Sequence, residues 1–139
     1  MKLWTIGYEG RTLPEFLDVL REAGVSLVCD VRRNPISRKK GFSKGALKRA
    51  LEGVDIRYEH LPELGIASAR RKNIRTPAQK AALFASYERE DLPRQKPALR
   101  KIAAWARGGR VALLCFERDP ADCHRSRVAQ ALRVATEDL

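Results

Sequence analysis

Residues 111–127 form the stretch that most constrains how this chain can fold. It opens with an apolar run that ends in Cys115 and is too short for a helix, which predicts a strand over residues 110–115. A polar turn around Pro120 follows. The segment after the turn predicts a helix, whose apolar residues are Val128, Ala131, Leu132 and Ala135. A strand, a loop and a helix in this order are typical of an α/β protein.

The start of that helix has two interpretations, which differ in what the helix dipole faces. Asp122 can cap a helix that begins at Cys123. Alternatively, Asp119 can cap a helix that begins at Pro120, with Asp122 in its third position. Only the first interpretation directs the positive end of the dipole at the Cys123-His124-Arg125 trio. The sequence leaves both open.

The first thirty residues predict a second unit of the same kind. Residues 3–6 are a short β-prone run, and residues 25–31 are apolar on both faces, as expected of a central parallel strand. Between them, Thr12 and Glu15 form a capping box for a helix that ends at Gly24. A strand, a helix and a strand of this length predict a right-handed crossover between parallel strands.

The middle of the chain continues the alternation. The predicted elements are a helix over residues 43–53, an edge strand over 56–61, a helix from the capping box of Thr76 and Gln79 to about residue 90, and a helix from about residue 97 to 108. Residues 66–75 are polar and basic without periodicity, which predicts a mobile loop or a segment ordered by a ligand. We therefore expect a single α/β domain over residues 1–139. It would be a three-layer Rossmann-like sandwich of about four mostly parallel strands, with helices on both faces.

The positive charge of the chain is concentrated in two segments. The formal net charge is +11, and residues 31–50 and 66–80 together carry 13 Lys and Arg residues with no acidic residue. Such patches attract polyanions, so we expect a nucleic acid or a phosphorylated small molecule as the partner. No apolar run approaches the length needed to span a bilayer, so no membrane partner is expected. The sequence predicts no oligomeric state.

The three cysteines are an odd number in dissimilar contexts, and the N-terminal residues lack the apolar core of a signal peptide. These features predict a cytoplasmic protein with reduced thiols. Cys29, inside a buried strand, is interpreted as a small hydrophobic residue.

Four motifs resemble those of the domain-of-unknown-function 488 family. They are Thr5-Ile-Gly-Tyr8-Glu9-Gly10, Asp30-Val-Arg32-x-x-Pro35-x-Ser37-Arg38, Tyr58-x-His60-x-x-x-Leu64-Gly65, and Cys115-x-Glu117 followed by Cys123-His124-Arg125. The resemblance runs over nearly the whole chain, with the motifs in the family's order. It implies a single α/β domain and no established activity.

Three of the predicted strands would end in polar motifs, and the carboxyl ends of parallel strands meet at one edge of a sheet. We therefore expect an anion site there, built from arginines and a serine because guanidinium groups bind phosphate oxygens in a bidentate manner. The predicted phosphate-binding residues are Arg32, Ser37, Arg38 and Arg125. The candidate catalytic residues are Glu117, His124 and Cys123, and the supporting residues are Tyr8, Glu9, Asp30 and Cys115.

Structural roles remain open for several of these residues. Asp30 with Arg32, and Glu117 with Arg125, can be structural ion pairs at strand ends. Tyr8 and Phe42 are candidates for stacking on bases, although a phenylalanine at position 42 is more often part of a core.

The leading hypothesis is a protein that binds the phosphate of a nucleic acid or nucleotide and acts on it, with Glu117 or His124 as acid or base. One alternative is a non-catalytic nucleic-acid-binding module. Another is thiol or sulfur-transfer chemistry, similar to that of rhodaneses, at Cys115 or Cys123. No metal site is predicted, because adjacent Cys and His residues rarely bind one tetrahedral ion and no Cys-x-x-Cys occurs. No cofactor is predicted, and the absence of a Gly-x-Gly-x-x-Gly or Walker loop argues against the commonest dinucleotide and nucleoside triphosphate binding modes.

Overall fold

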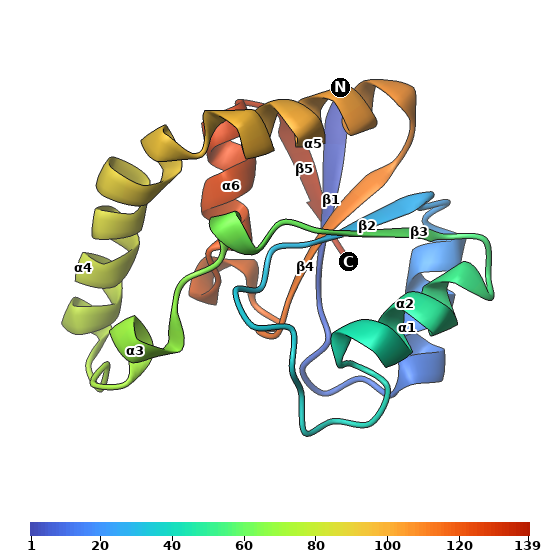
Figure 1. Cartoon of the computed structure of the whole chain (residues 1–139), viewed down its shortest axis with the longest axis horizontal. Helices are drawn as coiled ribbons and strands as arrows, with labels where there is room; N and C mark the ends of the chain where they lie inside the picture. The colour runs from blue at the N-terminus through green and yellow to red at the C-terminus, as the bar shows by residue number, and fades with distance from the viewer.

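The computed structural model describes all 139 residues and contains one five-stranded sheet (Figure 1). The strands are β1 (Lys2–Gly7), β2 (Leu27–Asp30), β3 (Arg57–His60), β4 (Val111–Cys115) and β5 (Ala135–Asp138). Their order is β3-β2-β4-β1-β5, and every neighbouring pair is parallel. The predicted α/β class is confirmed, with five strands instead of four.

Helices cover both faces of the sheet. They are α1 (Leu13–Glu22), α2 (Lys44–Glu52), α3 (Ser68–Arg71), α4 (Pro77–Ser86), α5 (Lys96–Gly108) and α6 (Arg125–Leu132). Buried residues of α1 and α2, such as Phe16 and Leu47, pack in one core with Leu114 of β4. Ile102 of α5 and Val128 of α6 pack in the other core with residues from the opposite face of the sheet. The three layers of the predicted sandwich are therefore present.

The two predicted capping boxes are confirmed. Thr12 accepts a hydrogen bond from the Glu15 amide, and the Glu15 carboxylate accepts one from the Thr12 amide. Thr76 and Gln79 make the same reciprocal pair at the start of α4. Ser43, the first residue of the helix predicted over 43–53, precedes α2 but makes no capping bond, because its hydroxyl group is bonded to the backbone of Ser37.

The prediction for the C-terminal residues was wrong. The last helix was expected to include Ala135, but α6 ends at Leu132, and Arg133 adopts a left-handed conformation with φ of 54°. The chain then forms β5, which pairs with β1 at the edge of the sheet. All four β5 residues are exposed, so a burial pattern could not reveal this strand.

The structure decides between the two interpretations of residues 119–122. Asp119 caps a short 3-10 turn, Pro120–Asp122, by accepting a hydrogen bond from the Ala121 amide. The longer helix α6 begins only at Arg125. Capping of a helix by Asp122 is therefore wrong.

Two further segments differ from expectation in detail. Residues 66–75 include one helical turn, α3, where the sequence predicted irregular structure. The helix predicted to reach about residue 90 is α4 followed by a π-helical turn, Tyr87–Asp91. Buried Tyr87 in this turn donates a hydrogen bond to the Leu64 carbonyl at 2.5 Å, which connects the end of α4 to the residues just before the basic segment 66–80. None of the helices combines the length and apolar character needed to cross a membrane.

Candidate functional site

A cavity of about 340 Å³ lies at the carboxyl edge of the sheet, and we call it the edge cavity. It is formed by the residue after β1, the loop after β2, the segment around α3, the loop after β4 and the residue before α6. Seven of the side chains proposed from the sequence line it: Tyr8, Arg32, Ser37, Arg38, Cys115, Glu117 and His124. Four others do not: Glu9, Asp30, Cys123 and Arg125.

The edge cavity is strongly basic. Arg33 and Arg38 line it from the loop after β2 with exposed side chains, and neither guanidinium makes a hydrogen bond or ion pair with a protein group. Arg71 reaches it from α3, where its guanidinium lies 3.8 Å from the Glu117 carboxylate. Glu117 is the only carboxylate in the lining. The two basic segments found in the sequence thus meet at one cavity, with most of its positive charge unneutralised.

Arg32 is held beneath this surface by other protein groups. Its Nε and Nη2 donate to the two carboxylate oxygens of fully buried Asp30, at 2.8 and 2.7 Å. Its Nη1 donates to the Phe42 carbonyl at 2.7 Å and to the Tyr8 hydroxyl at 3.2 Å. The Tyr58 hydroxyl donates to Asp30 at 2.5 Å. Because most of its donors are used within the protein, Arg32 chiefly fixes the loop that carries Arg33 and Arg38.

The aromatic residues of this region divide into buried and exposed groups. Tyr8 stacks on Phe42 with ring centroids 4.5 Å apart, and both are buried. Phe42 is fully buried, so it belongs to the core and cannot stack on a ligand. By contrast, Phe116 and Ile36 are 44% and 81% exposed and line the edge cavity. Neither residue was predicted from the sequence, because a single apolar residue in a polar loop carries no periodic signal.

Arg125 supports the loop after β4 from inside the protein. Its side chain is buried, and it donates to the carbonyl groups of Glu117 at 2.6 Å and Arg118 at 3.1 Å. It also donates to the sulfur of Cys115 at 3.0 Å. Arg125 thus bonds to the backbone carbonyl of Glu117, and the side chains of the two residues do not form the ion pair considered from the sequence. Glu9 also stabilises this loop, from the surface of the protein, because its carboxylate accepts a hydrogen bond from the Arg118 amide at 3.0 Å.

Gly7, the last residue of β1, lies directly under this loop. A Cβ atom at this position would overlap the Glu117 carbonyl. The loop after β4 can therefore cross the end of β1 only because position 7 has no side chain.

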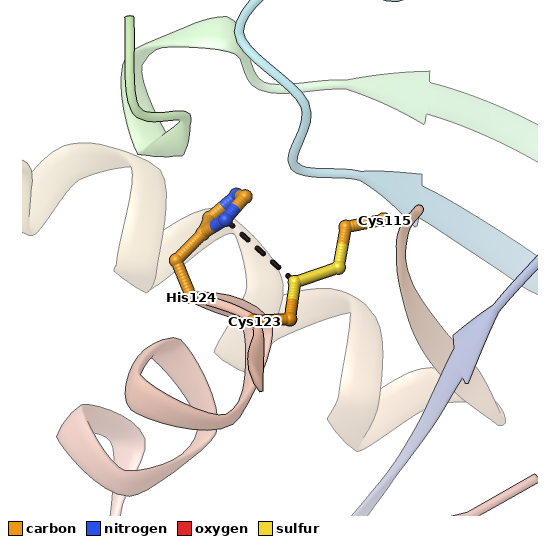
Figure 2. A group of neighbouring side chains, drawn as sticks. All are labelled: Cys115, Cys123 and His124. Carbon is orange, nitrogen blue, oxygen red and sulfur yellow. Dashed lines mark hydrogen bonds between the residues drawn. A yellow bond between two sulfur atoms is a disulfide. The ribbon is translucent and has the colours of Figure 1, made fainter. Parts of the chain in front are cut away.

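Cys115 and Cys123 are joined by a disulfide (Figure 2). The prediction that all thiols are reduced was therefore wrong for this pair, whereas buried Cys29 is free. The two cysteines meet because the loop after β4 folds back and returns Cys123 to the end of the strand that carries Cys115. Both cysteines are 1% exposed, although Cys115 contributes to the wall of the edge cavity.

His124 lies beside the two sulfurs in a fixed orientation (Figure 2). Its Nε2 lies 2.6 Å from the Val31 carbonyl, which can only accept, so Nε2 carries the proton. Its Nδ1 lies 3.7 Å from the Cys123 sulfur and 3.4 Å from Nη2 of Arg71. Burial lowers the pKa of His124 to about 4. The imidazole is therefore neutral at pH 7, and the lone pair of its Nδ1 faces Arg71 Nη2 and the Cys123 sulfur.

These contacts determine which chemistry each part of the site can support. The guanidinium groups of Arg33, Arg38 and Arg71 can hold an anion. Glu117 is a half-buried carboxylate that can exchange protons with a bound ligand. His124 is less suited to act as an acid, because its only proton is bonded to Val31.

No curated protein and no solved structure matches this chain. A family model does match it: the one described as domain of unknown function DUF488, over residues 12–132. Because the match covers most of the chain, this protein belongs to the DUF488 family.

Proposed function

We propose that the protein binds the phosphate of a nucleotide or nucleic acid in the edge cavity. The observation that carries this proposal is that the exposed guanidinium groups of Arg33 and Arg38 line a concave site and pair with no protein group. Unpaired guanidinium groups in such a site favour an anion, and their planar fork fits the oxygens of a phosphate.

The other lining residues favour a nucleotide over inorganic phosphate. Ser37 and Ser68 bring hydroxyl groups to the cavity, while Phe116 and Ile36 form an exposed apolar wall beside the arginines. Bases stack on exposed aromatic rings in many single-strand-binding proteins. A volume of about 340 Å³ lies within the range of small-molecule sites.

Glu117 is the residue that we propose for a reaction on the bound ligand. It is the only carboxylate in the lining, and Arg71 lies 3.8 Å from it. A carboxylate beside a cationic phosphate site can accept or donate a proton while the arginines stabilise negative charge.

A non-catalytic nucleic-acid-binding module is the second candidate. The observation that favours it is that the basic segments 31–50 and 66–80 both reach the cavity wall, so that positive charge continues beyond it. A polynucleotide could then follow the surface with one phosphate in the cavity.

The test is binding of labelled single-stranded and duplex oligonucleotides, and of mononucleotides, across a salt series. We expect Arg33→Ala/Arg38→Ala to reduce the slope of log affinity against log salt by about one unit per lost phosphate contact. The matched control is Arg100→Ala/Arg107→Ala, which removes two exposed charges from α5, outside the cavity. Equal weakening by both double variants, or no binding by the wild type, would refute the proposal.

A further inference from the structure

We propose that the reduced protein binds one Zn²⁺ ion through Cys115 Sγ, Cys123 Sγ and His124 Nδ1. The fourth coordination position would face the edge cavity. This inference goes beyond phosphate binding and does not rest on it, because none of the three ligands is among the arginines that hold the anion.

The three donor atoms form a compact group. They lie within 4.8 Å of one another, and each of the three residues is at most 2% exposed. Zinc bonds of about 2.3 Å to sulfur and 2.0–2.1 Å to nitrogen place tetrahedral ligand atoms about 3.6 Å apart. The distance of 3.7 Å between Cys123 Sγ and His124 Nδ1 fits one edge of such a tetrahedron.

Neighbouring groups prepare these atoms to bind a metal. The bond from His124 Nε2 to the Val31 carbonyl leaves the lone pair of the ring on Nδ1, the nitrogen that would bind a metal, and metal-bound histidines are usually held by such a bond. Arg125 donates to Cys115 Sγ at 3.0 Å, which favours the thiolate form that binds metals.

The backbone removes the objection that adjacent Cys and His residues rarely share one ion. Cys123 is extended, with φ of −133° and ψ of 151°, whereas His124 already has helical angles. This change between consecutive residues turns both side chains to the same side, so that the His124 ring lies beside the sulfurs (Figure 2).

The disulfide and the metal would use the same two sulfurs. Reduction by a dithiol or a phosphine supplies two electrons, and two protons complete the thiols. Zn²⁺ then displaces both protons when it binds the thiolates.

The cavity provides room for a fourth ligand. Cys115, His124 and Glu117 all contribute to its wall, and Glu117 Oε2 lies 3.4 Å from Cys115 Sγ. Glu117 is therefore placed to orient a water molecule on the ion. Arg71 Nη2 lies 3.4 Å from Nδ1, so this half-exposed side chain would have to turn away from His124 when a metal binds.

The experiment is a Co²⁺ titration of the full chain, reduced with a phosphine under anaerobic conditions, followed by competition with Zn²⁺. We expect one equivalent of Co²⁺ to bind, with sulfur-to-cobalt charge transfer and the intense visible bands of a tetrahedral site. Zn²⁺ should then displace it. The first control is the oxidised wild-type protein, which should bind no Co²⁺. Because this control needs no substitution, it does not depend on whether a variant folds.

Variants then assign the ligands. Cys115→Ser, Cys123→Ser and His124→Asn should each lose the tetrahedral spectrum, while Cys29→Ala should keep it because Cys29 lies in the core away from the site. The proposal is overturned if the reduced, folded wild type binds no stoichiometric Co²⁺ or Zn²⁺, which would make the pair a thiol redox couple instead. An unchanged spectrum in Cys115→Ser would also overturn it. Neither outcome bears on phosphate binding by Arg33 and Arg38.

Discussion

The fully buried carboxylate of Asp30 accepts two hydrogen bonds from the guanidinium of Arg32, at 2.8 and 2.7 Å. The pair lies where β2 ends and the basic loop begins, and Arg32 extends the contact to the Phe42 carbonyl. This arrangement joins the core of the sheet to the residues that line the edge cavity.

We therefore expect Arg32→Met to destabilise the protein strongly. The substitution leaves Asp30 buried without its counterion, which costs about 3–5 kcal/mol in comparable cases. Urea unfolding would measure the loss. Asp30→Asn/Arg32→Met removes both charges and should be less destabilised than Arg32→Met alone. If the free energy of unfolding of Arg32→Met lay within about 1 kcal/mol of the wild-type value, the structural role of the pair would be contradicted.

Gly7→Ala should also destabilise the protein and weaken ligand binding. The new Cβ atom would overlap the Glu117 carbonyl, so the loop after β4 would have to move. Gly108→Ala at the end of α5 is the matched control, since its Cβ atom would meet nothing within 4 Å. Thermal unfolding and oligonucleotide binding should change for Gly7→Ala only. Equal effects of the two substitutions would show that the close crossing is unimportant.

The elements with local signals were predictable from the sequence. Thr12 with Glu15 identified the start of α1, and the apolar runs identified β2 and β4, because capping and burial depend on neighbouring residues. The strand β5 has no buried residue, and its first residue, Ala135, was predicted to belong to the last helix. Its position is fixed by pairing with β1, a contact between the two ends of the chain.

The edge cavity was only partly predictable for the same reason. Parallel strands bring Ser37, Arg38 and Glu117 to one edge, which the topology implied. Whether an arginine faces the cavity or the protein interior depends on the conformation of its loop, which the sequence pattern does not reveal. Arg125 follows a predicted anion-binding pattern but is bonded to loop carbonyls, whereas Arg71 comes to the cavity from a segment without periodicity.

Glu117→Gln tests whether the protein acts on its ligand. The amide has nearly the same shape but cannot take a proton, so turnover of a bound nucleotide should be lost. Binding should persist or strengthen, because one negative charge leaves a cationic cavity. Product analysis and equilibrium binding would be measured on the same preparations. Unchanged turnover would remove Glu117 from the reaction, and a complete lack of turnover in the wild type would favour the non-catalytic module.

Phe116→Ala tests whether the exposed ring binds a base. Stacking on an aromatic side chain contributes about 1–3 kcal/mol per base, so affinity for a single-stranded oligonucleotide should fall about 5- to 150-fold. Affinity for pyrophosphate, which has no base, should not change, and Phe116→Tyr should retain oligonucleotide binding. Fluorescence anisotropy and competition with pyrophosphate would separate these effects. If Phe116→Ala weakens both ligands equally, the ring acts by shaping the loop after β4, and the cavity recognises phosphate alone.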